Sequence, residues 1–123
     1  MVKSRGLNHI NLNVSDINRS VRFYREALGL EVDFWEGKKI VFLSSPGGRD
    51  TITLCQAEPG APVGSAGVSH FGFAIGGESQ LDAAVEQFLR AGAKLLGRGE
   101  HAPGVPCAYF ADPDGYVIEL GNG

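Results

Sequence analysis

The sequence predicts an α+β fold made of two paired β-α-β-β-β modules, and two observations carry this prediction. A strand pattern followed by a helical pattern occurs twice, and the histidines that begin these repeats, His9 and His70, are 61 residues apart. Each helical pattern is followed by three short strand-like runs, separated by turn clusters rich in glycine and proline. The 18 glycines also indicate many turns rather than a helical bundle.

The first module begins with strict alternation of apolar and polar residues over 7–14, which is typical of a half-buried strand. Residues 15–28 then change to helical spacing, and Gly29 suits the left-handed position just past a helix end. We expect three further strands in this module, at 31–36, 40–43 and 51–55.

The second module repeats this order. Residues 70–75 alternate, residues 79–91 have helical spacing, and Gly92 follows the expected helix end. The remaining strands are expected at 94–96, 106–111 and 116–120.

We interpret the chain as a single domain covering 1–123. Its modules span about 6–57 and 68–121, joined by a Pro/Gly linker at 58–67. The apolar strand faces would cover the helices. The polar faces would then point together into a shared cavity enclosed by a curved sheet.

Composition limits the function classes. With 43% hydrophobic and 20% charged residues the chain is typical of globular proteins. A net charge of −3 argues against binding to nucleic acid or a membrane surface, because both need an excess of cations. The two cysteines are too few for a disulfide framework, and no signal-like or membrane-spanning apolar run is present. We therefore expect a cytoplasmic protein.

The polar strand faces carry candidate metal ligands. His9 and His70 occupy equivalent positions in the two modules, and Glu119 stands between two apolar residues of the last strand. If the modules pack about a pseudo-twofold axis, these three side chains converge, and two imidazoles with one carboxylate suit an open divalent site. Thr53 is the symmetric fourth position and is a poor ligand. The alternatives are hydrogen-bonded interior histidines and an edge-strand glutamate that faces water.

The motifs resemble those of the vicinal-oxygen-chelate superfamily, which includes glyoxalase I, extradiol dioxygenases, fosfomycin-resistance enzymes and bleomycin-resistance proteins. The resemblance covers residues 6–121 and rests on segments 7–10, 23–24, 28–30, 69–71 and 110–120. It implies metal ligation by His9, His70 and Glu119, with Fe(II), Mn(II), Zn(II) or Ni(II) as the divalent ion. It also implies a homodimer acting on a small molecule.

The departures from each subfamily leave the reaction open. Glyoxalase I uses a fourth carboxylate or amide ligand where this chain has Thr53. The extradiol signature is matched by His101, Tyr109 and Glu119, which makes His101 and Tyr109 candidate catalytic donors, but the base expected near Thr53 or Cys55 is not a histidine. Fosfomycin enzymes share the tyrosine, and only Arg98 and Lys94 are candidates to bind a phosphonate.

Several of these residues also have structural interpretations. His101 falls in 97–104, which we expect to be a loop, so it is either a solvated loop residue or part of a lid over the cavity. The second module is five residues longer at this point, as the spans 70–119 and 9–53 show. Tyr109 can belong to the core. The candidate cavity residues, of which the two aromatic ones can equally be core, are Asn11, Trp35, Phe42, Thr53 and Cys55.

The sequence thus predicts a small metalloenzyme that acts on an oxygen-chelating substrate, with dioxygenase-like, glyoxalase-like or fosfomycin-type thiol transferase chemistry. The alternative is a sequestration protein of the antibiotic-resistance kind, which would use the same cavity without catalysis.

Overall fold

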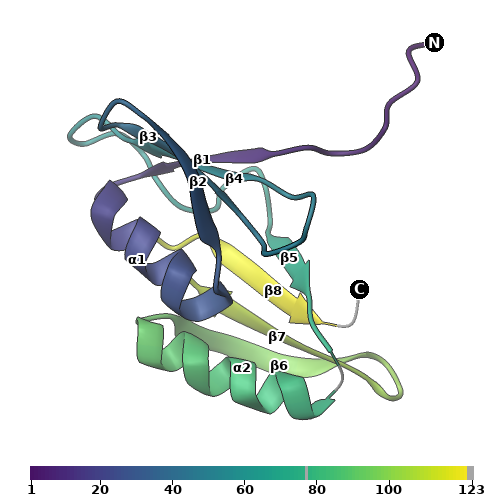
Figure 1. The fold of residues 1–123 in the computed structure, drawn as a ribbon. Coiled ribbons are helices and arrows are strands. Elements are labelled where there is room, and N and C mark those ends of the chain that lie inside the picture. Colours follow the sequence, from purple (N-terminus) through teal and green to yellow (C-terminus); the bar gives the residue numbers. More distant parts are fainter. Residues whose placement is uncertain (77, 122–123) are drawn as a thin grey trace.

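The computed structural model describes residues 1–76 and 78–121, and it confirms the predicted α+β fold with its repeated β-α-β-β-β order (Figure 1). The first module contains β1 (Ile10–Val14), α1 (Ile17–Leu28), β2 (Glu31–Glu36), β3 (Ile40–Ser44) and β4 (Ile52–Gln56). The second contains β5 (Phe71–Ala74), α2 (Glu78–Ala91), β6 (Lys94–Ala102), β7 (Val105–Ala111) and β8 (Val117–Gly121).

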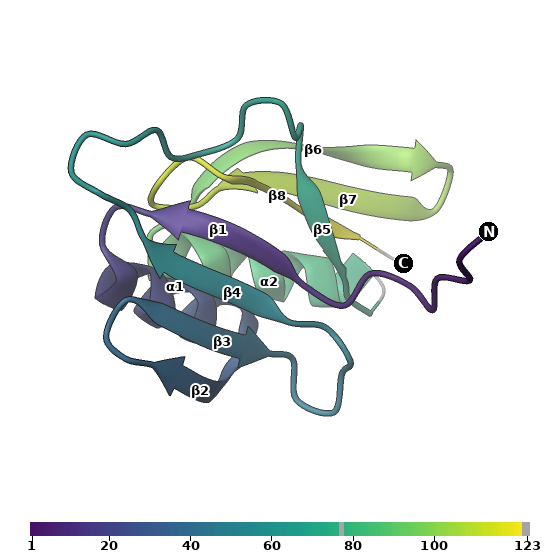
Figure 2. The same ribbon diagram turned by 90° about the horizontal axis from the view of Figure 1, so that it is seen from above.

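Each module forms its own four-stranded sheet (Figure 2). The strand orders are β1-β4-β3-β2 and β5-β8-β7-β6, and in both sheets the first two strands are parallel while the other neighbours are antiparallel. This common topology places Asn11 opposite Thr53 in one sheet and Gly72 opposite Glu119 in the other. The candidate site positions are therefore equivalent in the two sheets.

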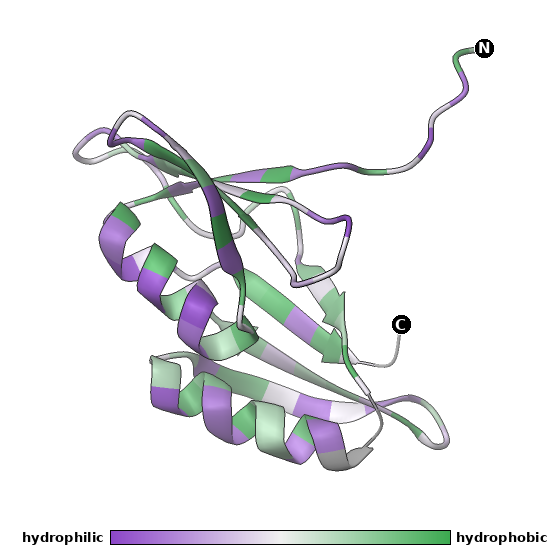
Figure 3. Ribbon diagram, in the orientation of Figure 1, coloured by the Kyte–Doolittle hydropathy of each residue, from purple (hydrophilic) through white to green (hydrophobic). Residues whose placement is uncertain are grey.

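The first helix begins and ends where its sequence predicts. The Asp16 side chain accepts a 3.1 Å hydrogen bond from the backbone N–H of Arg19, which caps the helix start. Gly29 has φ 66°, the left-handed conformation that ends a helix at little cost for glycine. Both helices contain polar and apolar residues in turn (Figure 3). Their apolar residues Phe23, Leu81 and Phe88 belong to the buried core.

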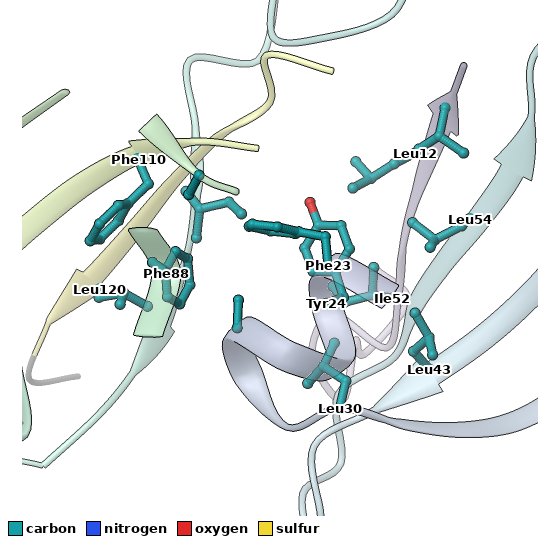
Figure 4. Close-up of a cluster of buried hydrophobic side chains, with 14 of the residues drawn as sticks. Leu12, Phe23, Tyr24, Leu30, Leu43, Ile52, Leu54, Phe88, Phe110 and Leu120 are labelled. Atoms are coloured by element: carbon teal, nitrogen blue, oxygen red, sulfur yellow. The ribbon is translucent and has the colours of Figure 1, made fainter. Parts of the chain in front are cut away.

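One core joins the two modules (Figure 4). Phe23 from α1 packs edge-on against Tyr24 and against Phe88 of α2, with ring centroids 5.0 and 5.9 Å apart. Phe88 in turn lies 4.5 Å from the ring of Phe110 on β7. Because these rings link both helices to the second sheet, truncating Phe23 to alanine should cost about 3–5 kcal/mol.

The main difference from the predicted elements lies in β6. We expected a strand at 94–96 and a loop at 97–104, but β6 continues to Ala102 and forms a hairpin with β7 that turns at Gly104, φ 80°. Two β-bulges interrupt its pairing, between Leu95 and Gly97 and between Glu100 and Ala102. Each bulge shifts the alternation by one residue, so the strand period is not visible in the sequence.

The segment between β4 and β5 contains no helix or strand and is held against the turn that precedes β8. The Ser65 hydroxyl accepts a 2.8 Å hydrogen bond from the Val117 N–H, and a Cβ added at Gly64 would lie 2.7 Å from the carbonyl oxygen of Asp114. A side chain at Gly64 would therefore push the two segments apart. Among residues 1–76 and 78–121, no helix is long and apolar enough to cross a membrane.

Candidate metal centre

Glu119 lies in the middle of β8 on the face that points away from the helices. Its neighbours Ile118 and Leu120 are fully buried in the core, whereas the Glu119 side chain keeps 18% of its surface exposed. The strand period of two explains this arrangement, because alternate residues point to opposite faces. The carboxylate therefore stands on a polar face that the core does not cover.

Two histidines contact this carboxylate from different strands. His70 directly precedes β5, and its Nε2 lies 3.1 Å from Oε2 of Glu119. Nε2 of His101, on β6, contacts Oε1 of the same group. A hydrogen bond from His101 is the main cause that lowers the pKa of the Glu119 carboxyl, and it outweighs the opposing effect of burial. The structure thus moves His101 from an expected loop to direct contact with the predicted ligand.

Tyr109 completes this polar face. It lies opposite Glu119 in the pairing of β7 with β8, and its ring meets the His70 ring edge-on at 5.3 Å. Partial burial, and then the negative charge of Glu119, raise the pKa of the Tyr109 phenol. The hydroxyl therefore stays protonated at neutral pH and can donate a hydrogen bond to a ligand.

Cys107 is the residue that sequence reasoning missed. It lies two residues before Tyr109 on β7, and the ligand atoms of His101, Cys107 and Glu119 all lie within 4.8 Å of one another. From the sequence, the two cysteines are too few for a disulfide framework, and only Cys55 is a candidate site residue, as part of the cavity. The signal that could have identified Cys107 is its strand parity with Tyr109, which places both on one face.

Three glycines near Glu119 differ in the space around them. A Cβ added at Gly72 would lie only 3.0 Å from the Glu119 carbonyl oxygen and 3.4 Å from its Cβ, so β5 approaches β8 closely at this point. Across β7, a Cβ at Gly97 or Gly99 would meet no atom within 4 Å. Both positions therefore leave room above the sheet for a ligand.

His9 lies on the other sheet. It precedes β1, and Nδ1 of its ring is hydrogen-bonded to Oδ1 of the Asn8 side chain. The set of candidate metal ligands formed by His101, Cys107 and Glu119 does not include His9. His9 and Gly72 do line a common cavity of about 320 Å3, so His9 faces the strand that pairs with Glu119 but does not reach the carboxylate within this chain.

The polar face of the first sheet forms a second cavity, of about 430 Å3. Of the predicted cavity residues, four line it together with His9: Asn11, Phe42, Thr53 and Cys55. The Thr53 side chain is buried, and its hydroxyl has no hydrogen-bond partner. Trp35, the fifth, lies opposite Val41 on the other face of the sheet and packs against the core.

The two cations suggested for phosphonate binding do not line the 430 Å3 cavity. Arg98 is opposite Ala108, a fully buried core residue, and donates a 2.8 Å hydrogen bond to Asp82 on α2. It therefore belongs to the helix side of the sheet. Lys94 is exposed at the start of β6, opposite Ala111. The described lining of this cavity includes Glu36 and His9 but no lysine or arginine.

The turn before β8 is held by a network from the first module. Oδ1 of Asp112 accepts 2.9 Å hydrogen bonds from the N–H groups of Asp114 and Tyr116, while Oδ2 accepts a 2.6 Å bond from the Tyr24 hydroxyl. Asp114 accepts a 3.0 Å charge-assisted bond from Arg19 of α1. The strand that carries Glu119 is thus positioned by the helix of the other module.

Comparison with known proteins agrees with this arrangement. The profile of the Glyoxalase/Bleomycin resistance protein/Dioxygenase superfamily matches residues 6–120, and the chain belongs to this superfamily. It is 32% identical over 120 residues to the metallothiol transferase FosB of Shouchella clausii, an alignment that covers 96% of this chain and 80% of that protein. It is 27% identical to the glutathione transferase FosA of Serratia marcescens, covering 94% and 79%.

Solved structures show the same fold. The fosfomycin resistance protein FosX of Listeria monocytogenes, in complex with Mn(II) and 1S,2S-dihydroxypropylphosphonic acid, superimposes with a TM-score of 0.81 at 24% identity, covering 98% of this chain and 92% of that chain. The lactoylglutathione lyase of Agrobacterium tumefaciens superimposes with a TM-score of 0.76 at 23% identity, covering 98% and 95%. These structural similarities show the shared fold, and the FosB relatives are named as metallothiol transferases.

The donor set around Glu119 fits a divalent cation. Imidazole nitrogen, carboxylate oxygen and thiol sulfur are the side-chain ligands of first-row metals, and all three types meet at this face. The glycines beside them leave the space that an ion and its remaining ligands need.

Proposed function

We propose that this chain is a divalent-metal-dependent enzyme that adds a thiol or water to a small oxygen-bearing substrate. The observation that carries the proposal is the Glu119 carboxylate, which two imidazoles contact beside the protonated phenol of Tyr109. The similarity to FosB over nearly the whole chain supports the thiol-transferase form of this chemistry.

In this proposal His70 and Glu119 hold the cation, and His9 supplies the third ligand. When bound, the cation would supply Lewis-acid polarisation of a substrate oxygen. The Tyr109 hydroxyl would donate a hydrogen bond to the oxygen on which negative charge develops. The nucleophile forms a new bond to a substrate carbon, the bond from that carbon to oxygen breaks, and the released oxygen takes up the proton lost by the thiol or water.

Thr53 favours addition over isomerisation. A glyoxalase-type reaction moves a proton between carbon atoms of the substrate and needs a base at the fourth ligand position. The buried Thr53 hydroxyl cannot take up a proton near neutral pH. Addition of a thiol needs no such base on the protein, because a thiol can enter as its thiolate, whereas addition of water would depend on the bound cation to lower the pKa of the water.

A second copy of the chain would bring His9 to the metal. Strands β1 and β5 each stand at the end of a sheet, so each has one edge without a strand partner among residues 1–76 and 78–121. Exposed strand edges of this kind favour pairing with another chain. In a homodimer the polar face of one first sheet would lie over the Glu119 face of the other chain, and the 430 Å3 cavity would become the substrate pocket.

The cavity lining points to a substrate that chelates the metal. With Glu36 and His9 but no lysine or arginine in its described lining, the cavity would bind an anion mainly through the metal. We therefore expect small substrates with adjacent oxygens to be preferred over phosphonates that need several cationic side chains.

The decisive experiment combines metal analysis with activity. The purified protein should bind about one divalent ion per chain, and His70→Ala and Glu119→Gln should each reduce metal content and thiol-transfer activity together. Panels of epoxides and of hemithioacetals, with glutathione, other small thiols or water, distinguish addition from isomerisation. Oxygen consumption with catechols would assign dioxygenase chemistry instead. Tight binding of a drug without metal would assign sequestration.

A further inference from the structure

We propose that His101 and Cys107 are metal ligands together with Glu119, so that one chain holds a zinc-like ion through a set that does not need His9. The inference rests on the proposed function only for the role of Glu119 as a ligand. It adds a thiolate and a third imidazole to the histidines and glutamate predicted from the sequence.

The distances suit a metal. The ligand atoms of His101, Cys107 and Glu119 lie within 4.8 Å of one another. In a tetrahedral site with bonds of about 2.0–2.3 Å, ligand atoms are roughly 3.3–3.8 Å apart. To surround an ion, the most separated of these atoms would approach by about 1 Å, and the contacting atoms of His101 and Glu119 would move apart to let the ion in between. Nε2 of His70, 3.1 Å from Glu119 Oε2, stands beside the group as a fourth donor.

The β-bulge near the hairpin end directs His101 to this group. Glu100 pairs with Pro106 and Ala102 pairs with Val105, so His101 is the one extra residue on β6. Bulges of this kind redirect a side chain and are frequent beside functional sites. Gly99, which pairs with Cys107, has no side chain to stand between the sulfur and the imidazole.

Cys107 is buried but is not an ordinary core residue. Its exposure is 4%, and among the described residues it does not belong to the apolar cluster between helices and sheets. It lies on the same face of β7 as Tyr109, next to two metal-binding side-chain types. Cys55, the other free cysteine, belongs to no metal-capable group of the described residues, which makes it a matched control.

A thiolate ligand would determine which ion the site prefers. Thiolates favour zinc and cobalt over manganese and magnesium, whose usual ligands are oxygen atoms. A single chain would therefore bind zinc or cobalt more tightly than manganese or magnesium, even before it assembles with a second copy. Binding would release the proton of the Cys107 thiol.

Cobalt(II) titration of the full-length protein tests this inference without any activity measurement. We expect a thiolate-to-cobalt charge-transfer band in the near ultraviolet, unchanged in Cys55→Ser and absent in Cys107→Ser. His101→Ala should weaken cobalt binding by at least about tenfold. His9→Ala should keep the band and change the affinity by less than about threefold.

A labelling experiment covers the case in which Cys107→Ser fails to fold. In Cys55→Ser, zinc should slow alkylation of the remaining thiol at least about tenfold, because the metal-bound sulfur is not a free nucleophile. Cobalt binding without the charge-transfer band, a band that persists in Cys107→Ser, or alkylation that zinc does not slow would each overturn the inference. In those cases a metal content that depends on His70 would leave the proposed function standing. Failure to bind any divalent metal would overturn both.

Discussion

The Tyr24 hydroxyl donates a 2.6 Å hydrogen bond to Oδ2 of Asp112, and this bond joins the helix of the first module to the turn that leads into β8. Both side chains are buried. The same Asp112 carboxylate accepts two backbone N–H bonds within its own turn. The location of Glu119, seven residues further along the chain, therefore depends on packing between the modules.

Removing this hydroxyl should destabilise the protein and weaken the metal site. In Tyr24→Phe the buried Asp112 carboxylate loses a donor, and we expect the free energy of unfolding to fall by about 1–3 kcal/mol. Tyr116→Phe is the matched control, because the Tyr116 hydroxyl donates to the exposed Asn13 carbonyl and should cost less. Urea denaturation of both variants checks this. Equal losses in the two would contradict the role given to Asp112.

The same carboxylate predicts a dependence of stability on pH. Burial is the main cause that raises the pKa of Asp112, so the folded state favours its protonated form. The contribution of this group is full below the unfolded-state pKa of about 4, and it is lost as the pH rises through the raised folded-state pKa. Relative to Asp112→Asn, the wild type should lose stability as the pH increases across this window. A gain in relative stability would show that the hydrogen bonds to the carboxylate outweigh burial.

The close approach of β5 to β8 predicts different effects of two similar substitutions. Gly72→Ala places a methyl group 3.0 Å from the Glu119 carbonyl oxygen, and we expect a loss of about 1–3 kcal/mol in stability together with weaker metal binding. Gly97→Ala meets no atom within 4 Å and should change stability by less than about 0.5 kcal/mol. Thermal unfolding and metal titration measure both. A neutral Gly72→Ala would mean that the strands separate without cost.

The unpartnered Thr53 hydroxyl predicts opposite effects on stability and on substrate binding. Thr53→Val removes a buried polar atom that has no partner, so the protein should become more stable by about 1 kcal/mol. If the hydroxyl binds substrate, KM should rise while kcat changes little. Steady-state kinetics and denaturation on one preparation give both values. A destabilised variant with an unchanged KM would exclude a substrate contact.

Mixing two inactive variants tests whether His9 acts across a dimer. His9→Ala and Glu119→Gln should each be inactive alone. Unfolded together and refolded as a mixture, they should recover about a quarter of wild-type activity, because each mixed dimer contains one site with both residues intact. If His9 and Glu119 act within one chain, no mixture restores activity.

The sequence by itself determined the repeated module and the faces of its strands. Alternation and helical spacing are local properties, so they identified the buried positions Leu12 and Leu120 and placed Glu119 on the opposite face. The glycine at the end of the first helix was equally visible, because the left-handed conformation favours that residue. The superfamily followed from motifs within single strands and turns.

Only the tertiary structure decided which polar residues meet. Contact of His101 with Glu119, 18 residues away in sequence, depends on a bulge that no local period reveals. The place of Cys107 beside them depends on the register of β7 against β6 and β8. His9 shares the strand position of His70 but lies on a separate sheet, because equivalence between repeats fixes a residue's face and not its distance from the other repeat.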